Sequence, residues 1–243
     1  MNHAVARLRA VRLAASDKPF LARGSGAGRC PGCRLVETHC VCGLRPSVPV
    51  NAGVCLIMGD TEALKPSNTG WLVADVVTDT HAFAWARTAV DPSLLALLAD
   101  SQRQPWLVFP AEYAEPGRVV TRLPGPEETA ASGRRPLFVL LDGTWSEARK
   151  MFRKSPYLDA LPVLSLQPAE ASSYRLRRSV HGHHLCTAEV AAACLSLAGE
   201  GAAAEVLGAW LNVFSAHYLS AKRGPPLDRD SAAHQWLRGI TGR

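Results

Sequence analysis

The chain has 243 residues, 47% of them hydrophobic, and a formal net charge of +6. This length buries a sizeable core as one domain, or as one domain with a small appendage, and the positive charge permits an anionic partner. No apolar run reaches the about 20 residues of a membrane span, and neither a P-loop nor a G-x-G-x-x-G motif indicates ATP, NAD or FAD.

Most of the positive charge lies in residues 1–29, where six Arg and Lys residues face a single Asp. This segment ends in residues 24–28, a Gly- and Ser-rich run typical of flexible linkers. We predict a disordered basic arm, which would make loose RNA contacts or remain a solvated tail. A transit peptide is the alternative, because the segment is rich in Arg and poor in acidic residues.

Four of the seven cysteines lie close together, in the spacing C-x2-C-x6-C-x-C. Cys30, Cys33, Cys40 and Cys42 can provide the four thiolates of one tetrahedral zinc site. Nothing in residues 28–46 resembles a core element, so a metal would supply the folding energy of this module. We predict structural zinc and a reducing, cytoplasmic location, with reduced unliganded cysteines as the alternative.

The first predicted strand is the apolar run 54–58. Lys65, Asn68 and Thr69 follow it, and such polar groups after a strand can hold a phosphate or a carboxylate. An ordinary polar loop that caps a helix at 71–77 is the alternative.

The pattern then predicts a strand near 80–86, an amphipathic helix at 92–98 and a buried strand at 106–110 that ends in Pro110. Residues 111–136 are rich in Pro and Gly, and we expect little regular structure there.

Residues 137–141 form an apolar run that predicts another buried strand. Asp142 and Gly143 end it, and Thr144 stands three residues before Glu147, which is the capping-box spacing of a helix start. The predicted unit is a strand, a tight turn and a helix. In an open α/β sheet this places Asp142 at the carboxyl end of a strand, where ligands bind.

The helix after Asp142 carries Arg149 and Arg153, and Lys150 and Lys154, at i,i+4 spacing. Four cations beside a candidate reactive carboxylate favour contact with a phosphate backbone. The alternative is an ordinary solvated helix face.

A strand is expected at 162–166. Tyr174, Arg175 and Arg178 follow it, and these residue types stack on bases and bind phosphates. Further on, residues 185–191 begin an Ala-rich helix with Thr187 as the expected N-cap, and a second helix is expected at 202–221.

The motif Asp142-Gly143-Thr144-Trp145 resembles the D-x-T-W signature of DTW-domain proteins, and the resemblance continues to Met151. It extends over roughly residues 30–222 through five further stretches: the cysteine cluster, Lys-x-x-Asn-Thr at 65–69, the strand ending at Pro110, Ser-x-Tyr-x-x-Arg from Ser172, and residues 185–191. These proteins are tRNA-uridine aminocarboxypropyltransferases related to the SPOUT class, whose C-terminal part forms a trefoil knot.

The resemblance implies transfer of the 3-amino-3-carboxypropyl group from S-adenosylmethionine to N3 of a tRNA uridine, with release of methylthioadenosine. Asp142 would act as the base or hold the uridine imide, and a free Asp, with a pKa near 3.9, is a weak base for an imide. The expected catalytic residues are Asp142, Thr144 and Trp145. Expected cofactor contacts are Pro110, Leu141, Asp142, Leu185, Cys186, Thr187 and Glu189. Expected RNA contacts are Lys65, Asn68, Thr69, Arg149, Lys150, Arg153, Tyr174, Arg175 and Arg178.

Alternating strands and helices predict an α/β fold with a largely parallel sheet flanked by helices, and the resemblance adds a SPOUT-like knot. The expected organisation is an arm at 1–29, a zinc module at 30–46, a catalytic domain at 47–222 and a tail at 223–243. Two alternatives remain: a SPOUT-like RNA methyltransferase and a non-catalytic zinc-containing RNA-binding module. The sequence leaves open the tRNA species, the nucleotide position and the oligomeric state.

Overall fold

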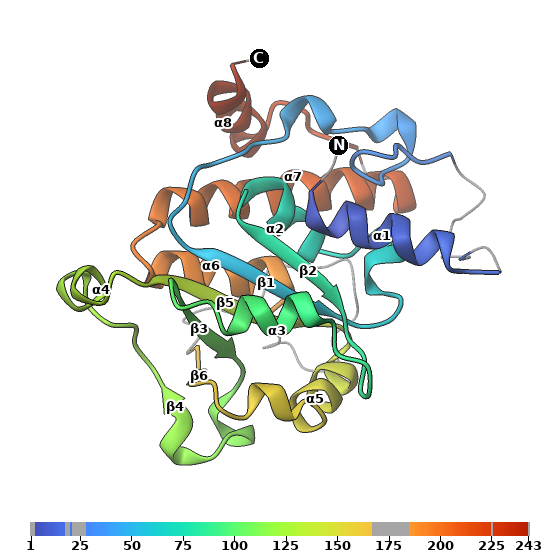
Figure 1. Cartoon of the computed structure of the whole chain (residues 1–243). Coiled ribbons are helices and arrows are strands. Elements are labelled where there is room, and N and C mark those ends of the chain that lie inside the picture. Colours follow the sequence, from blue (N-terminus) through green and yellow to red (C-terminus); the bar gives the residue numbers. More distant parts are fainter. Residues whose placement is uncertain (1–2, 18–19, 21–27, 167–184, 225, 243) are drawn as a thin grey trace.

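The computed structural model describes residues 3–17, 20, 28–166, 185–224 and 226–242. Its centre is one six-stranded sheet in the order β2-β1-β5-β3-β6-β4, and every neighbouring pair of strands is parallel (Figure 1). The strands are β1 (Gly53–Met58), β2 (Thr80–Ala84), β3 (Arg103–Val108), β4 (Val119–Val120), β5 (Arg135–Asp142) and β6 (Val163–Leu164). The predicted α/β class and parallel sheet are confirmed.

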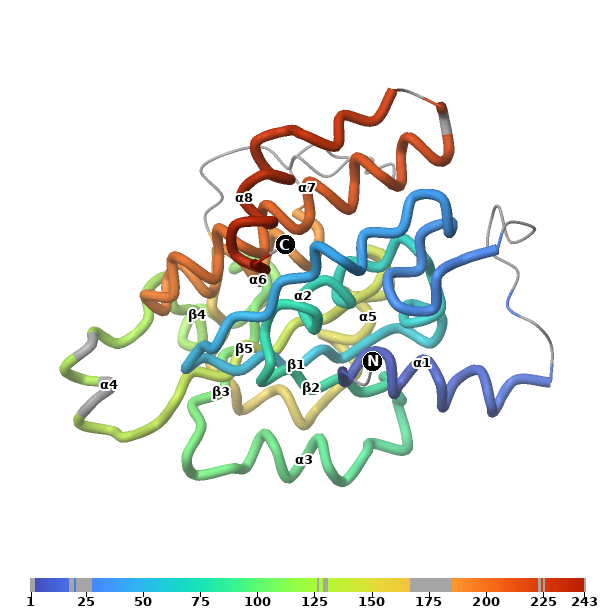
Figure 2. The backbone as a smooth tube through the Cα atoms, turned by 90° about the horizontal axis from the view of Figure 1, so that it is seen from above, coloured from blue at the N-terminus to red at the C-terminus, as the bar shows by residue number. Residues whose placement is uncertain are grey.

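Helices cover both faces of the sheet, which gives three layers (Figure 2). One face packs against α2, α6 and α7, and the other packs against α3 and α5. The helices are α1 (Ala4–Ala14), α2 (Gly70–Val76), α3 (Pro92–Leu98), α4 (Pro126–Ser132), α5 (Trp145–Arg153), α6 (Thr187–Leu197), α7 (Gly201–Arg223) and α8 (Ala232–Thr241).

The central strands are continuous apolar runs because both of their faces are buried, as is usual in parallel sheets. In β1, Val54, Leu56 and Met58 face α2, α6 and α7, whereas Cys55 and Ile57 face α3 and α5. This alternation follows from the two-residue period of a strand. It also decides on which side of the sheet each side chain at a strand end lies.

The N-terminal arm is not disordered throughout, in contrast to our prediction. Helix α1 spans Ala4–Ala14 and packs against α2 and β2. Val5 is fully buried in the main core, Arg9 donates to the Leu64 carbonyl oxygen, and Arg12 contacts Asp60. The arginines looked like a solvated run in the sequence, but two of them bind the loop after β1. Residues 18–19 and 21–27 of the arm lie outside the described residues.

Residues 111–136 are more regular than expected. They contain the edge strand β4, the short helix α4 and two single 3-10 turns. The tail also has structure, because α8 packs against α7. His217 of α7 and His234 of α8 are both buried, and their Nε2 atoms lie 3.0 Å apart. Within the described residues, no helix is long and apolar enough to cross a lipid bilayer.

Candidate functional site

Asp142 is the last residue of β5, beside Met58 at the end of β1. The chain leaves β1 through α2 on one face and leaves β5 through α5 on the other face. Open α/β sheets bind ligands at such a switch point, at the carboxyl ends of the strands. The Gly59 amide donates to the Asp142 carbonyl oxygen at 2.8 Å and fixes the two strand ends together.

The Asp142 side chain is 2% exposed and receives hydrogen bonds on both oxygens. The Asn68 Nδ2 atom donates to Oδ2 at 2.7 Å, and the Thr187 hydroxyl donates to Oδ1 at 2.7 Å. Hydrogen bonds to a carboxylate are about twice as strong as neutral ones, so this pair of donors fixes the orientation of the group. The three residues come from three different elements, and the fold brings them together.

The first turns of two helices, α2 and α6, lie beside the Asp142 side chain. The Asn68 Oδ1 atom accepts from the Trp71 amide at 3.0 Å in the first turn of α2, whose N-cap is Thr69, while the Asn68 Nδ2 atom donates to Asp142. Gly70 follows, and a Cβ atom there would lie 2.5 Å from Asp142 Oδ2. Only glycine allows this approach. Thr187 is the first residue of α6, whose N-terminal dipole also favours a carboxylate.

Thr187 is not the N-cap of α6, which corrects the sequence prediction. Cys186 is the N-cap, and its amide donates to Glu189 Oε2 at 2.7 Å. The Thr187 hydroxyl is thereby left to bind Asp142. Burial raises the pKa of the Cys186 thiol to about 12, so it is a poor nucleophile at neutral pH.

Two of the three predicted RNA contacts in the loop after β1, Asn68 and Thr69, are buried, because the loop folds inward. Asn68 is 0% and Thr69 4% exposed, and the Thr69 hydroxyl accepts from the Ala188 amide at 3.4 Å. Lys65 is half-buried and forms an ion pair with Glu62, which is fully buried. Glu62 was not among the predicted site residues, and its only signal in the sequence is its i,i+3 spacing from Lys65.

Thr144 and Trp145 lie beyond Asp142, at the start of α5. The predicted capping box is confirmed, because the Glu147 amide donates to the Thr144 hydroxyl at 3.3 Å and the Thr144 amide donates to Glu147 Oε2 at 2.8 Å. The Trp145 ring is stacked on Phe109 at 5.4 Å. Leu141 and Trp145 pack on the α5 face of the sheet, opposite to the face of Asp142.

Pro110 follows β3 and begins a 3-10 turn that carries Tyr113. The Tyr113 ring meets Trp145 edge-on at 5.6 Å and is 36% exposed. Two cations of α5 lie over aromatic rings. The Arg149 guanidinium is 6.0 Å from the centre of the Trp145 ring, and the Lys150 ammonium is 5.4 Å from the centre of the Trp85 ring. This surface therefore combines aromatic rings with positive charge.

Lys150 and Arg153 are exposed on α5, as the prediction of a cationic face requires. The other predicted RNA contacts, Tyr174, Arg175 and Arg178, lie outside the described residues.

The four predicted metal ligands come together. The Sγ atoms of Cys30, Cys33, Cys40 and Cys42 all lie within 4.8 Å of one another, and three pairs lie 3.5, 3.5 and 3.8 Å apart. A tetrahedral zinc site with Zn–S bonds of about 2.3 Å places its sulfurs about 3.8 Å apart. The donor set and its spacing therefore fit zinc.

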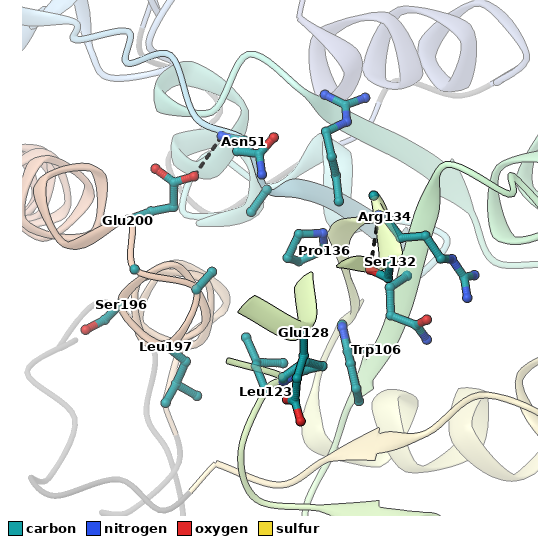
Figure 3. A pocket seen from close by; sticks show the side chains of 17 residues that line it. Asn51, Trp106, Leu123, Glu128, Ser132, Arg134, Pro136, Ser196, Leu197 and Glu200 are labelled. Atoms are coloured by element: carbon teal, nitrogen blue, oxygen red, sulfur yellow. Dashed lines mark hydrogen bonds between the residues drawn. The ribbon is translucent and has the colours of Figure 1, made fainter. Parts of the chain in front are cut away.

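A cavity of about 930 Å³ lies at the opposite, amino-terminal edge of the sheet (Figure 3). Its walls include Asn51, Trp106, Arg134 and Glu200, and the Asn51 amide donates to Glu200 Oε1 at 2.7 Å. Volume alone would favour this cavity. We assign the site to the carboxyl edge, because the buried polar groups converge on Asp142 there and the switch point lies there.

The parallel sheet flanked by helices defines an α/β protein, and the carboxylate between two helix starts is its candidate site at the strand ends. The family model "DTW domain" matches residues 27–219, and the chain belongs to the DTW-domain family. Membership implies a tRNA-modifying function with tRNA as the substrate. No solved structure matches the chain.

Proposed function

We propose that this protein transfers the 3-amino-3-carboxypropyl group of S-adenosylmethionine to N3 of a uridine in tRNA. The observation that carries the proposal is the Asp142 carboxylate, held by Asn68 and Thr187 at the switch point of the sheet in a member of a tRNA-modifying family. A carboxylate in this position accepts a hydrogen bond from an imide N–H and aims the N3 atom.

The reaction forms one N–C bond and breaks one C–S bond. Uridine N3 attacks the carbon next to sulfur on the amino-acid side, the C–S electron pair leaves with methylthioadenosine, and the N3 proton passes by way of the Asp142 carboxylate to solvent water. The sulfonium is already a good leaving group. The enzyme must therefore select one of three carbons by holding it in line with N3 at about 3 Å.

Asp142 suits an orienting role better than that of the sole base. Both of its oxygens already accept hydrogen bonds, and these bonds fix the direction of the remaining lone pairs. The oriented carboxylate would then accept a hydrogen bond from N3–H and stabilise the positive charge that develops as N3 attacks. Thr144 and Trp145 would support the site from the first turn of α5.

The cofactor would bind at the carboxyl ends of β3 and β5 and at the start of α6. The proposed contacts are Pro110, Leu141, Asp142, Leu185, Cys186, Thr187 and Glu189. A helix start suits the cofactor carboxylate, because helix N-termini bind anions.

The tRNA would lie across α5. Arg149, Lys150 and Arg153 would contact the phosphate backbone of the tRNA. The partly exposed rings of Tyr113 and Trp145 would stack on unpaired bases of the tRNA. Tyr174, Arg175 and Arg178 remain proposed RNA contacts. Zinc bound by the four cysteines would stabilise the cysteine module. We further propose that the C-terminal part forms a SPOUT-like knot and that the protein is cytoplasmic.

The test is product analysis with purified protein, S-adenosylmethionine and a uridine-containing tRNA. We expect methylthioadenosine and a uridine nucleoside heavier by one aminocarboxypropyl group. S-adenosylhomocysteine together with a methylated nucleoside would show a methyltransferase instead. Binding of tRNA without binding of the cofactor in calorimetry would show a non-catalytic module.

A further inference from the structure

We infer that Arg34 is a positioning residue that joins the four-cysteine module to the Asn68–Asp142 pair. The inference rests on the proposed function, because it assumes that Asp142 lies at the reacting site. It assigns the metal module a direct part in shaping that site.

Arg34 follows the ligand Cys33 and has an unusual backbone. Its φ is +66°, and within the described residues no other non-glycine residue has a positive φ. The left-handed conformation disfavours residues with a Cβ, and glycine or asparagine is the usual choice there. The Arg34 amide donates to the Cys30 carbonyl oxygen at 2.8 Å, so the turn between the two ligands holds this conformation.

The strained backbone sends the Arg34 side chain into the protein, where the residue is 3% exposed. Its Nη1 atom donates to the Lys65 carbonyl oxygen at 2.9 Å, and its Nη2 atom donates to the Asn68 carbonyl oxygen at 3.1 Å. The guanidinium also lies 4.2 Å from the centre of the Trp71 ring. One side chain thus holds both ends of the turn 65–68 and packs on the start of α2.

The same turn sets the position of the Asn68 side chain. The Asn68 amide donates to the Lys65 carbonyl oxygen at 3.0 Å, and the Asn68 side chain joins the Trp71 amide to Asp142. Arg34 binds the backbone carbonyl of Asn68 and contacts the ring of Trp71. A shift of the guanidinium would therefore move the amide group that orients Asp142.

The geometry requires arginine. The planar guanidinium presents donors in a fixed fork and stacks on aromatic rings, whereas a lysine ammonium is a point charge on a flexible stem. A metal ion held by the four thiolates would fix the turn from Cys30 to Cys33, and through it the backbone of Arg34. Metal occupancy and the geometry of Asp142 are therefore coupled, and loss of either the metal or the guanidinium loosens the same turn.

The experiment measures amide hydrogen exchange of the full-length protein at Asn68 and Trp71. The Trp71 amide is the direct reporter, because its acceptor is the Asn68 side chain. We expect Arg34→Lys and Arg34→Ala to speed exchange at both amides by about tenfold or more, since hydrogen bonds from a charged donor are lost. S-adenosylmethionine affinity, measured by calorimetry, should fall in parallel.

Arg118→Ala is the matched control. Arg118 also donates to two carbonyl oxygens, those of Leu158 and Leu161, on the other side of the fold. It should change stability without changing exchange at Asn68 and Trp71. Equal exchange at these amides in the Arg34 variants and the Arg118 variant would overturn the inference.

Metal removal provides the second arm. A chelator should speed exchange at Asn68 and Trp71 in the wild-type protein and add little in Arg34→Lys, because both act through one turn. A full additional effect in the variant would contradict the coupling. Exchange does not depend on turnover, so a wild-type protein that makes no aminocarboxypropyluridine would reject the proposed function while this test still decides the inference.

Discussion

The carboxyl ends and the amino ends of the parallel strands form two opposite edges of the sheet, and each edge has a buried or half-buried aspartate with different partners. At the carboxyl edge, Asn68 and Thr187 both point at Asp142, and the start of α2 approaches it through Gly70. At the amino edge, Arg103 binds both oxygens of Asp79 near the cavity of about 930 Å³.

This difference shows that a large cavity and an oriented carboxylate need not lie at the same edge of the sheet. The Arg103–Asp79 pair satisfies its own charges and needs no ligand. Hydrogen bonds from His81 and Arg103 lower the pKa of Asp79 well below its usual range. The donors at Asp142 instead orient one buried carboxylate at the end of a strand, which is where open α/β sheets bind their ligands. We therefore expect substitution of Asp142 to lower the transfer activity, and substitution of Asp79 to lower the stability without changing the transfer activity.

The largest effect is expected from Asp142→Asn. The amide keeps the size of the side chain but places a donor against Asn68 or Thr187, so the oriented acceptor is lost. Transfer should fall by about a hundredfold or more, measured as methylthioadenosine release. Glu128→Gln, in the wall of the amino-edge cavity, is the control and should retain full activity. Equal activity in both variants would erase the distinction between the edges.

Gly70→Ala should have the next largest effect. The new Cβ would lie 2.5 Å from Asp142 Oδ2, so α2 or the carboxylate must move. We expect a loss of about 1–3 kcal/mol in unfolding free energy, together with reduced transfer. Gly208→Ala in α7 is the matched control, because no atom lies within 4 Å of its Cβ position, and it should stabilise the protein by about 0.5–1 kcal/mol. Denaturant unfolding of both variants measures the contrast.

Asp79→Asn tests the amino edge. Because the folded-state pKa of Asp79 is lowered, its contribution to stability is present above the unfolded value near 3.9 and is lost as the pH falls. The variant should lose about 2 kcal/mol at pH 7, and the difference from wild type should shrink below about pH 4. Transfer at pH 7 should be unchanged at a temperature where both proteins are folded. A loss of transfer like that of Asp142→Asn would show that this edge takes part in the reaction.

The smallest effect is expected at the proposed RNA surface. Lys150→Ala should weaken tRNA binding modestly and reduce the slope of log affinity against log salt by about 1, because one phosphate contact is lost. Lys222→Ala, an exposed lysine near the end of α7, should leave the slope unchanged. Equal slopes for both variants would remove α5 from the RNA path. Titrations of labelled tRNA at several salt concentrations give the slopes.

The sequence predicted those parts of the carboxyl edge that depend on local pattern. The strand before Asp142 and the capping box of Thr144 and Glu147 are formed by neighbouring residues, so spacing was sufficient. The partners of Asp142 lie 74 and 45 residues away in the chain, and no local period connects them. Asn68 was therefore expected to contact RNA, although it is a buried partner of Asp142.

Helix α1 and Arg34 were missed for a related reason. The arginines of the arm suggested solvated charge and Arg34 carried no signal of its own. Only the fold shows that Arg9 and Arg34 bind backbone carbonyls of the loop after β1. A guanidinium that satisfies buried carbonyl groups looks the same in a sequence as one that faces water. Long-range hydrogen bonds are the part of this site that local pattern does not encode.

The most direct test of the carboxyl-edge assignment is hydrogen exchange of the wild-type protein with and without S-adenosylmethionine. On cofactor binding we expect slower amide exchange at the carboxyl edge, in residues 59–70, 141–147 and 185–190. Residues 123–136 and 196–200, around the amino-edge cavity, should not change. Protection confined to those two segments would contradict the central claim and would move the site to the opposite edge of the sheet.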